Sequence, residues 1–97
     1  MRRLFAVLRT KGRAWDGAKP MRQQPQWPEH GVFMDQLAAD GVVVLGGPLE
    51  GSDDFLLAIS AADEGEVNRT LARDPWSKSG TLEIKRIQPW TILLKSG

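Results

Sequence analysis

The stretch Gly41–Ser60, GVVVLGGPLEGSDDFLLAIS, contains two short apolar runs separated by a cluster of turn-forming residues. The runs are Val42–Leu45 and Phe55–Ile59, and the segment between them is rich in Gly, Pro, Ser and Asp. Short apolar runs bounded by such residues are typical of two strands joined in a hairpin. Because neighbouring positions are apolar, we expect both faces of the sheet to be covered. A chain of this size can cover one face with its own helices, so the other face points to a partner.

Length and composition set the outer limits on function. The 97 residues are enough for one domain, spanning positions 1–97. The net charge of +1 gives no reason to expect a nucleic-acid partner. The absence of cysteine excludes disulfides and thiolate chemistry, and with a single histidine we expect no metal site within one chain. The chain has no membrane-span-like run, and Leu4–Leu8 is too short for the core of a signal peptide, so we expect a cytoplasmic protein.

The segments on either side of the hairpin have distinct patterns. Leu4–Leu8 is an uninterrupted apolar run that predicts a central strand. Residues 10–26 are polar; the simplest interpretation is a solvated loop, although loops this long in small domains are more often functional or flexible. From Pro28 to Gly41, apolar side chains recur at spacings of three and four, which predicts an amphipathic helix.

The remainder of the chain predicts another helix and another strand. Asp63 and Glu66 have the spacing of a capping box, and we expect the helix that they begin to end at Asp74-Pro75. Residues 81–85 alternate as in a half-buried strand. Residues 89–94 are apolar and either form a further strand or pack across a dimer.

The resulting order is strand, helix, strand, strand, helix, strand. This order predicts the α+β class with a ferredoxin-like βαββαβ arrangement, an antiparallel sheet and two helices on one face. The bare apolar face would then meet the same face of a second copy, so we expect a homodimer.

Particular residues on these elements suggest a family. The series His30, Gly41, Gly46-Gly47-Pro48 and Asp74-Pro75, followed by a strand and Pro89-Trp90, resembles the YciI-like (YCII-related) proteins of the dimeric α+β barrel superfamily. The resemblance runs from Leu4 to Leu94, and the order and spacing of the motifs carry it. It implies a His-Asp pair as the active site, carried here by His30 and Asp74. It also implies lyase-like roles, such as eliminations from small ring substrates.

The residues themselves leave two interpretations of this pair. His30 is the only histidine, and on the apolar stripe of its helix it is either a core residue bonded to a carbonyl or a general base. Asp74 before a proline is either a plain helix terminator or the carboxylate that orients the imidazole.

A second set of residues is expected to bind the substrate: Gly46, Gly47, Pro48, Trp76, Arg22 and Trp27. Glycines at a strand end form a bulge or leave room for a ligand against exposed amides. Trp76 either borders an apolar pocket or anchors the core. The segment with Trp15, Arg22 and Trp27 departs from the family pattern, which leaves the substrate open.

Several cations lie near the first loop: Arg9, Arg13, Lys19 and Arg22. They could hold an anionic substrate, but a solvated basic loop is the simpler explanation for most of them. Two functions therefore stay open. One is a small enzyme that transfers a proton without a cofactor. The other is a non-catalytic dimer that binds a small molecule or acts as an accessory protein on the same scaffold.

Overall fold

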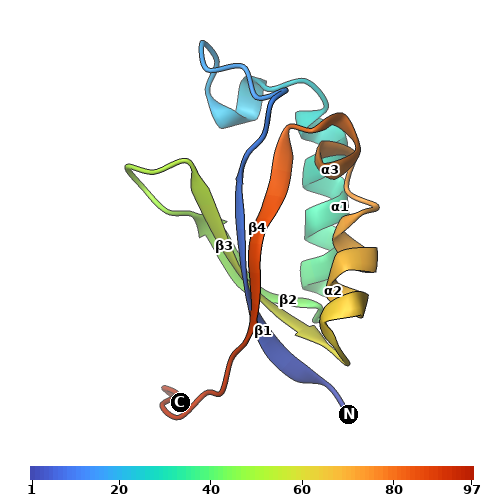
Figure 1. Cartoon of the computed structure of the whole chain (residues 1–97), viewed down its shortest axis with the longest axis vertical. Helices are drawn as coiled ribbons and strands as arrows, with labels where there is room; N and C mark the ends of the chain where they lie inside the picture. Colours follow the sequence, from blue (N-terminus) through green and yellow to red (C-terminus); the bar gives the residue numbers. More distant parts are fainter.

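Three helices cover one face of a four-stranded antiparallel sheet in the computed structural model, which describes residues 1–97 (Figure 1). The strand order across the sheet is β2-β3-β1-β4. In chain order the elements are β1 (Arg3–Lys11), the 3-10 turn η1 (Met21–Gln23), α1 (Trp27–Ala39), β2 (Val43–Pro48), β3 (Asp54–Ala61), α2 (Glu64–Leu71), α3 (Pro75–Ser79) and β4 (Leu82–Pro89). This α+β arrangement is compatible with the predicted ferredoxin-like fold.

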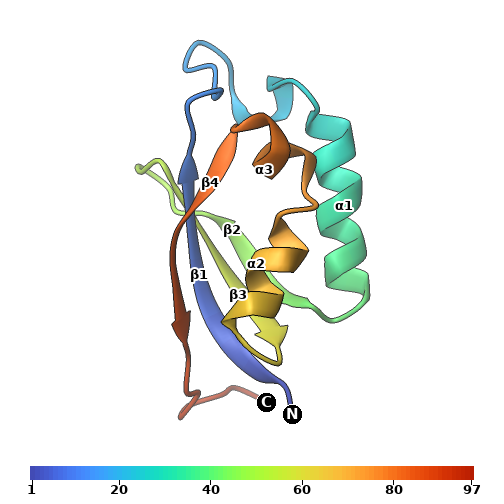
Figure 2. The same cartoon turned by 45° about the vertical axis from the view of Figure 1, so that its right-hand side comes forward.

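The helices lie together on one side of the sheet, and the two chain termini lie at the same end of the molecule (Figure 2). None of the helices is long and apolar enough to cross a bilayer.

The strand β1 is central, as expected from its apolar run, and it pairs with β3 on one side and β4 on the other. Along β1 the side chains alternate between the two faces of the sheet. Phe5, Val7 and Arg9 are buried, whereas Leu4, Ala6 and Leu8 are only half-buried. The register with β4 shifts between Leu8 and Arg9, which marks a bulge beside Arg9, and β1 then continues to Lys11.

The core lies between the sheet and the helices. Its buried members are Phe5, Val7, Leu57, Ile59 and Ala61 from the two central strands, Leu37 from α1, and Val67 and Leu71 from α2. Burying one such large aliphatic side chain contributes roughly 1.5–3 kcal/mol to folding. The amphipathic pattern of both helices therefore determines which face they turn toward the sheet.

Helix α1 ends in a Schellman motif that turns the chain into β2. The amide of Val42 donates to the carbonyl of Leu37 at 2.9 Å, and that of Gly41 donates to Ala38 at 3.1 Å. Gly41 has a φ of +75°, a left-handed conformation that glycine adopts without steric cost. The predicted helix end before Gly41 is confirmed.

The predicted hairpin is also confirmed, with one difference at its glycines. Gly46, Gly47 and Pro48 belong to the ladder of β2, opposite Leu57, Leu56 and Phe55 of β3. The bulge lies earlier in the strand, between Val43 and Leu45. A Cβ on Gly46 would lie 2.4 Å from Leu57 Cδ2, whereas nothing lies within 4 Å of one on Gly47. Close packing between β2 and β3 therefore requires a glycine at position 46 only.

The second helix begins as predicted, because the carboxylate of Asp63 accepts a hydrogen bond from the amide of Glu66 at 2.8 Å. The prediction that it ends at Asp74-Pro75 is wrong. Helix α2 ends at Leu71, and Asp74 instead caps the N-terminus of a further helix, α3, in which Pro75 occupies the first turn. Proline suits the first turn because a backbone N–H there would have no partner within the helix, so its absence costs nothing.

The C-terminal apolar segment does not add a strand to this sheet. Strand β4 ends at Pro89, and residues 90–97 have no regular secondary structure. The amide of Trp90 still donates to the carbonyl of Leu4 at 2.9 Å, but Leu93 and Leu94 are almost fully exposed.

Candidate active site

His30 and Asp74 lie within hydrogen-bond distance of one another. The Nδ1 atom of His30 lies 2.9 Å from Oδ1 and 3.0 Å from Oδ2 of Asp74. Asp74 is completely buried and His30 is 9% exposed. The first turns of α1 position the imidazole, and the N-terminus of α3 positions the carboxylate, so the tertiary fold brings together two residues that are far apart in the sequence. The approach expected from the family resemblance is thus present.

The carboxylate of Asp74 has two further partners. Its Oδ1 accepts from the backbone amide of Trp76 at 2.9 Å, and its Oδ2 accepts from Nη1 of Arg9 at 2.9 Å. Burial opposes ionisation of Asp74 and is the largest single influence. The hydrogen bonds from His30 and the Trp76 amide and the charge of Arg9 together outweigh it, and the pKa of Asp74 is lowered. Asp74 is therefore ionised at neutral pH.

Arg9 is one of the four cations for which the sequence left two interpretations open. It is 1% exposed, so it is not one of the solvated loop cations. Its Nη1 donates to Asp74 and its Nη2 donates to Oγ of Ser77 at 2.8 Å. Burial lowers the pKa of Arg9, and the attraction of Asp74 offsets only part of this effect; a guanidinium nevertheless stays charged. The alternation of side chains along a strand could have revealed the burial of Arg9, because position 9 lies on the same strand face as Phe5 and Val7.

Two tryptophans hold the imidazole of His30. The Trp76 ring is stacked on it, with centroids 3.9 Å apart and planes inclined by 10°, and its Nε1 donates to the carbonyl of Pro25 at 2.8 Å. The Trp27 ring lies 5.9 Å from the imidazole at a tilt of 44°. With Asp74 on Nδ1, these contacts leave the ring little freedom to rotate.

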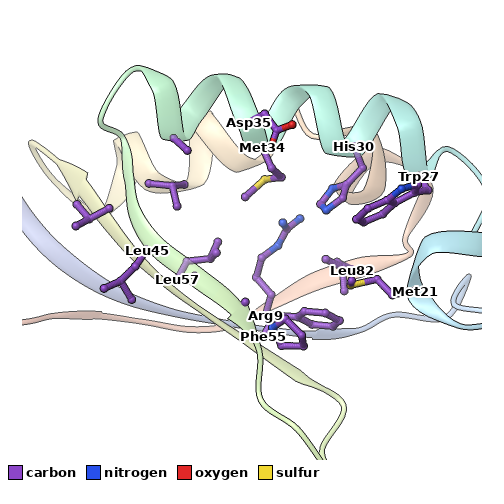
Figure 3. Close-up of a pocket in the computed structure, with 16 residues that line it drawn as sticks. Arg9, Met21, Trp27, His30, Met34, Asp35, Leu45, Phe55, Leu57 and Leu82 are labelled. Carbon is purple, nitrogen blue, oxygen red and sulfur yellow. The ribbon is translucent and has the colours of Figure 1, made fainter.

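A pocket of about 410 Å³ opens in front of His30, between α1 and strands β2 and β3 (Figure 3). The ionisable side chains that line it are Arg9, His30 and Asp35, and Asp35 is exposed. The other lining residues are apolar or glycine: Met21, Trp27, Met34, Ala38, Val43, Val44, Leu45, Gly46, Gly47, Pro48, Phe55, Leu57 and Leu82. The pocket is therefore mainly hydrophobic, with a cation and an imidazole on its inner side.

The predicted substrate-binding residues divide into two groups. Trp27, Gly46, Gly47 and Pro48 line the pocket with His30. Trp76 and Arg22 do not. Trp76 is completely buried as an anchor beside His30, and exposed Arg22 lies outside, with its guanidinium carbon 5.5 Å from the Trp27 ring centroid.

The glycines give the pocket less room than the sequence suggested. The space that the missing side chain of Gly46 leaves is occupied by Leu57, and only Gly47 has free space around it.

The long segment before α1 is ordered by internal hydrogen bonds. The side chain of Gln24 is buried; its Oε1 accepts from the Asp16 amide and its Nε2 donates to the carbonyls of Asp16 and Lys19. Trp15 from the same segment contacts Trp76 edge-on, with centroids 5.7 Å apart. This segment brings Met21 to the pocket wall, so it forms part of the site.

The hydrogen bonds determine what His30 can do chemically. An ionised carboxylate only accepts hydrogen bonds. The Nδ1 atom of His30 therefore carries the hydrogen and donates a hydrogen bond to Asp74. In the neutral ring the lone pair is then on Nε2, and Figure 3 shows the ring directed into the pocket. No three His, Asp or Glu side chains are placed to hold a metal ion together. The arrangement provides one oriented base in an apolar pocket.

Comparison with known proteins identifies the family. No curated protein matches the chain. The model of the YCII-related domain matches residues 4–91, which is nearly the whole chain. The chain therefore belongs to the YCII-related domain family.

Proposed function

We propose that this protein is a small cofactor-independent enzyme that removes a proton from a small, largely apolar molecule and promotes a lyase-like elimination. The hydrogen bond between His30 Nδ1 and the ionised Asp74 carries this proposal. It holds the imidazole in the tautomer whose Nε2 lone pair faces the pocket, which is the geometry that a general base requires.

Asp74 would support the reaction in two ways. It orients the ring before the substrate arrives, and its negative charge stabilises the imidazolium that forms when Nε2 takes the proton. The carboxylate can do both because its remaining lone pairs already have partners in Arg9 and the Trp76 amide. It therefore stays in one orientation throughout.

The pocket supports a small substrate. A volume of about 410 Å³ lies within the range of small-molecule sites, and an apolar lining excludes competing water from the base. Met21, Trp27 and Met34 form flat or adaptable apolar walls close to His30 (Figure 3).

We also propose that two copies pack through the face of the sheet that carries no helix, giving the dimeric α+β barrel that the resemblance implies. This face presents Leu4, Ala6 and Leu8 of β1 beside Leu56 and Ala58 of β3. Leu45 on the neighbouring β2 is 61% exposed. A contiguous apolar face of this kind on a small domain is typical of a protein interface.

A generic base probe tests the catalytic proposal before the natural substrate is known. A nitrobenzisoxazole opens when a base removes the one C–H proton of its isoxazole ring: the N–O bond breaks, and the molecule becomes a coloured phenolate that carries a nitrile group. We expect the wild-type protein to accelerate this opening and the His30→Asn variant to lose about 10²-fold or more, as is usual for loss of a general base.

Two further variants test whether the acceleration depends on the His30–Asp74 pair or on any carboxylate near α1. Asp74→Asn should lose most of the acceleration. Asparagine is still an N-cap, but Arg9 loses its counter-ion, so the rates are compared at a temperature at which the variant is folded. The matched control is Asp40→Asn, which removes an exposed carboxylate at the other end of α1. Equal rates for wild type and folded His30→Asn would overturn the proposal and leave a binding protein.

A further inference from the structure

The Nε atom of Arg9 is the one buried side-chain nitrogen or oxygen in the chain that has no hydrogen-bond partner. A guanidinium carries several N–H donors, and for Arg9 only the contacts of Nη1 with Asp74 and of Nη2 with Ser77 are made. A buried charged donor without a partner costs free energy, so such groups call for an explanation. The contacts with Asp74 and Ser77 therefore leave the Nε–H donor of Arg9 unused.

Arg9 also differs from Asp74 in what it faces. Arg9 lines the pocket, whereas Asp74 does not, because it lies behind the imidazole. In Figure 3 the Arg9 side chain rises from the sheet toward α1, with its guanidinium between Met34 and His30. The pocket is therefore bordered on its inner side by a cation, and the carboxylate that balances this cation is directed elsewhere.

The surroundings strengthen the effect of this charge. The lining near Arg9 is apolar, and the other charged lining residue, Asp35, is exposed at the rim. In such a poorly solvated site a cation attracts an anion more strongly than it does in water. Guanidinium is also the side-chain group best matched to a carboxylate, which it can bind through parallel N–H donors.

From these contacts we infer that the pocket takes a small carboxylate, with Arg9 binding its anionic oxygens and the apolar walls holding its hydrocarbon part beside His30. This inference names the substrate class of the proposed function and rests on it for the reaction, but the binding step can be measured without any turnover.

Paired probes of equal shape test the charge requirement. Phenylacetate and phenylacetamide differ in charge but hardly in size, and their binding can be followed by NMR or calorimetry. We expect wild-type protein to bind the carboxylate about tenfold or more tightly than the amide, the scale of one charge-assisted hydrogen bond. Equal affinities for the two probes would overturn the inference.

Variants locate the charge. Arg9→Met should abolish the preference for the carboxylate, while the matched control Lys78→Met, which removes an exposed cation from α3, should retain it. Because Arg9→Met leaves the buried carboxylate of Asp74 without its counter-ion, the Arg9→Met/Asp74→Asn double variant provides a neutral version of the pair. A preference that persists in the folded double variant would contradict the role of Arg9.

The Asp74→Asn variant separates this inference from the proposed function. It removes the negative charge that balances Arg9, so the carboxylate should bind several-fold more tightly, while the opening of the nitrobenzisoxazole slows. Tighter binding without any His30-dependent turnover would retain the carboxylate site and reject the enzyme. If the wild-type protein opens the nitrobenzisoxazole but Asp74→Asn binds the carboxylate no more tightly than wild type, the base is retained and the carboxylate site is rejected.

Discussion

The indole ring of Trp76 lies flat on the imidazole of His30, with the ring centroids 3.9 Å apart and the planes within 10°. Trp76 is completely buried and is fixed further by the hydrogen bond from its Nε1 to the Pro25 carbonyl. The stack covers the face of the imidazole next to α3 and leaves the ring edge to the pocket. It also couples an optical reporter to the candidate catalytic base.

Tryptophan fluorescence should therefore report the contact between Trp76 and His30. An imidazole in contact with an indole alters its emission, so we expect His30→Asn to change the emission intensity of the folded protein at a fixed pH. The measurement compares the emission spectra of wild type and His30→Asn. Trp76→Phe is the control background, because it keeps an aromatic ring in the stack but removes the reporter; the same change on adding His30→Asn in that background would assign the signal to another tryptophan.

Asp74→Asn should destabilise the protein in a pH-dependent manner. The pKa of Asp74 is lowered in the folded state, so the stabilisation is present above the unfolded-state pKa of about 3.9 and is lost as the pH falls through the folded-state value. We expect a loss of about 3–5 kcal/mol at pH near 7, because Arg9 loses its buried counter-ion.

Urea unfolding of both proteins at neutral pH and near pH 3 measures this difference. The gap between wild type and Asp74→Asn should narrow at the acidic pH, because the Asp74 carboxylate takes up a proton in the unfolded chain before it does so in the folded protein, where its pKa is lowered. A gap of the same size at both pH values would show that the ionised form of Asp74 contributes nothing to stability.

The two adjacent glycines of β2 should respond differently to alanine. A methyl group at position 46 meets Leu57 Cδ2 at 2.4 Å and the Leu56 carbonyl oxygen at 3.1 Å, so Gly46→Ala should cost about 1–3 kcal/mol through overpacking. Gly47→Ala meets nothing within 4 Å and should lie within about 0.5 kcal/mol of wild type. Thermal melts of the two variants compare them directly, and equal losses would contradict the observed packing of β2 on β3.

A charge on the helix-free face should prevent dimer formation. Ala6→Asp places a carboxylate among Leu4, Leu8 and Ala58, where it would be desolvated between two sheets. Sedimentation at micromolar concentration should give a dimer for wild type and a monomer for this variant. Val32→Asp, at a position on α1 that is 71% exposed, should stay dimeric. A stable wild-type monomer would refute the proposed assembly.

Local sequence patterns were enough to predict every strand and the two longer helices of the fold. Apolar runs and turn residues located β1, β2 and β3, the three-four spacing located α1, and Asp63 with Glu66 located the start of α2. The short helix α3 was missed, because Asp-Pro ends one helix and begins another with the same residues. The exposed apolar residues after Pro89 were also ambiguous, since their packing partner is not local.

The sequence by itself determined the periodicities, the caps and the family pattern that relates His30 to Asp74. Only the tertiary structure decided what surrounds that pair. Arg9 precedes Asp74 by 65 positions, and they meet because β1 lies beside β4 in the sheet and α3 packs against β4 and α1. Burial of a polar side chain depends on which elements cover it, and that depends on contacts distant in the sequence. For this reason the sequence could not separate Arg9, which is the buried cation of the site, from the other cations near the first loop.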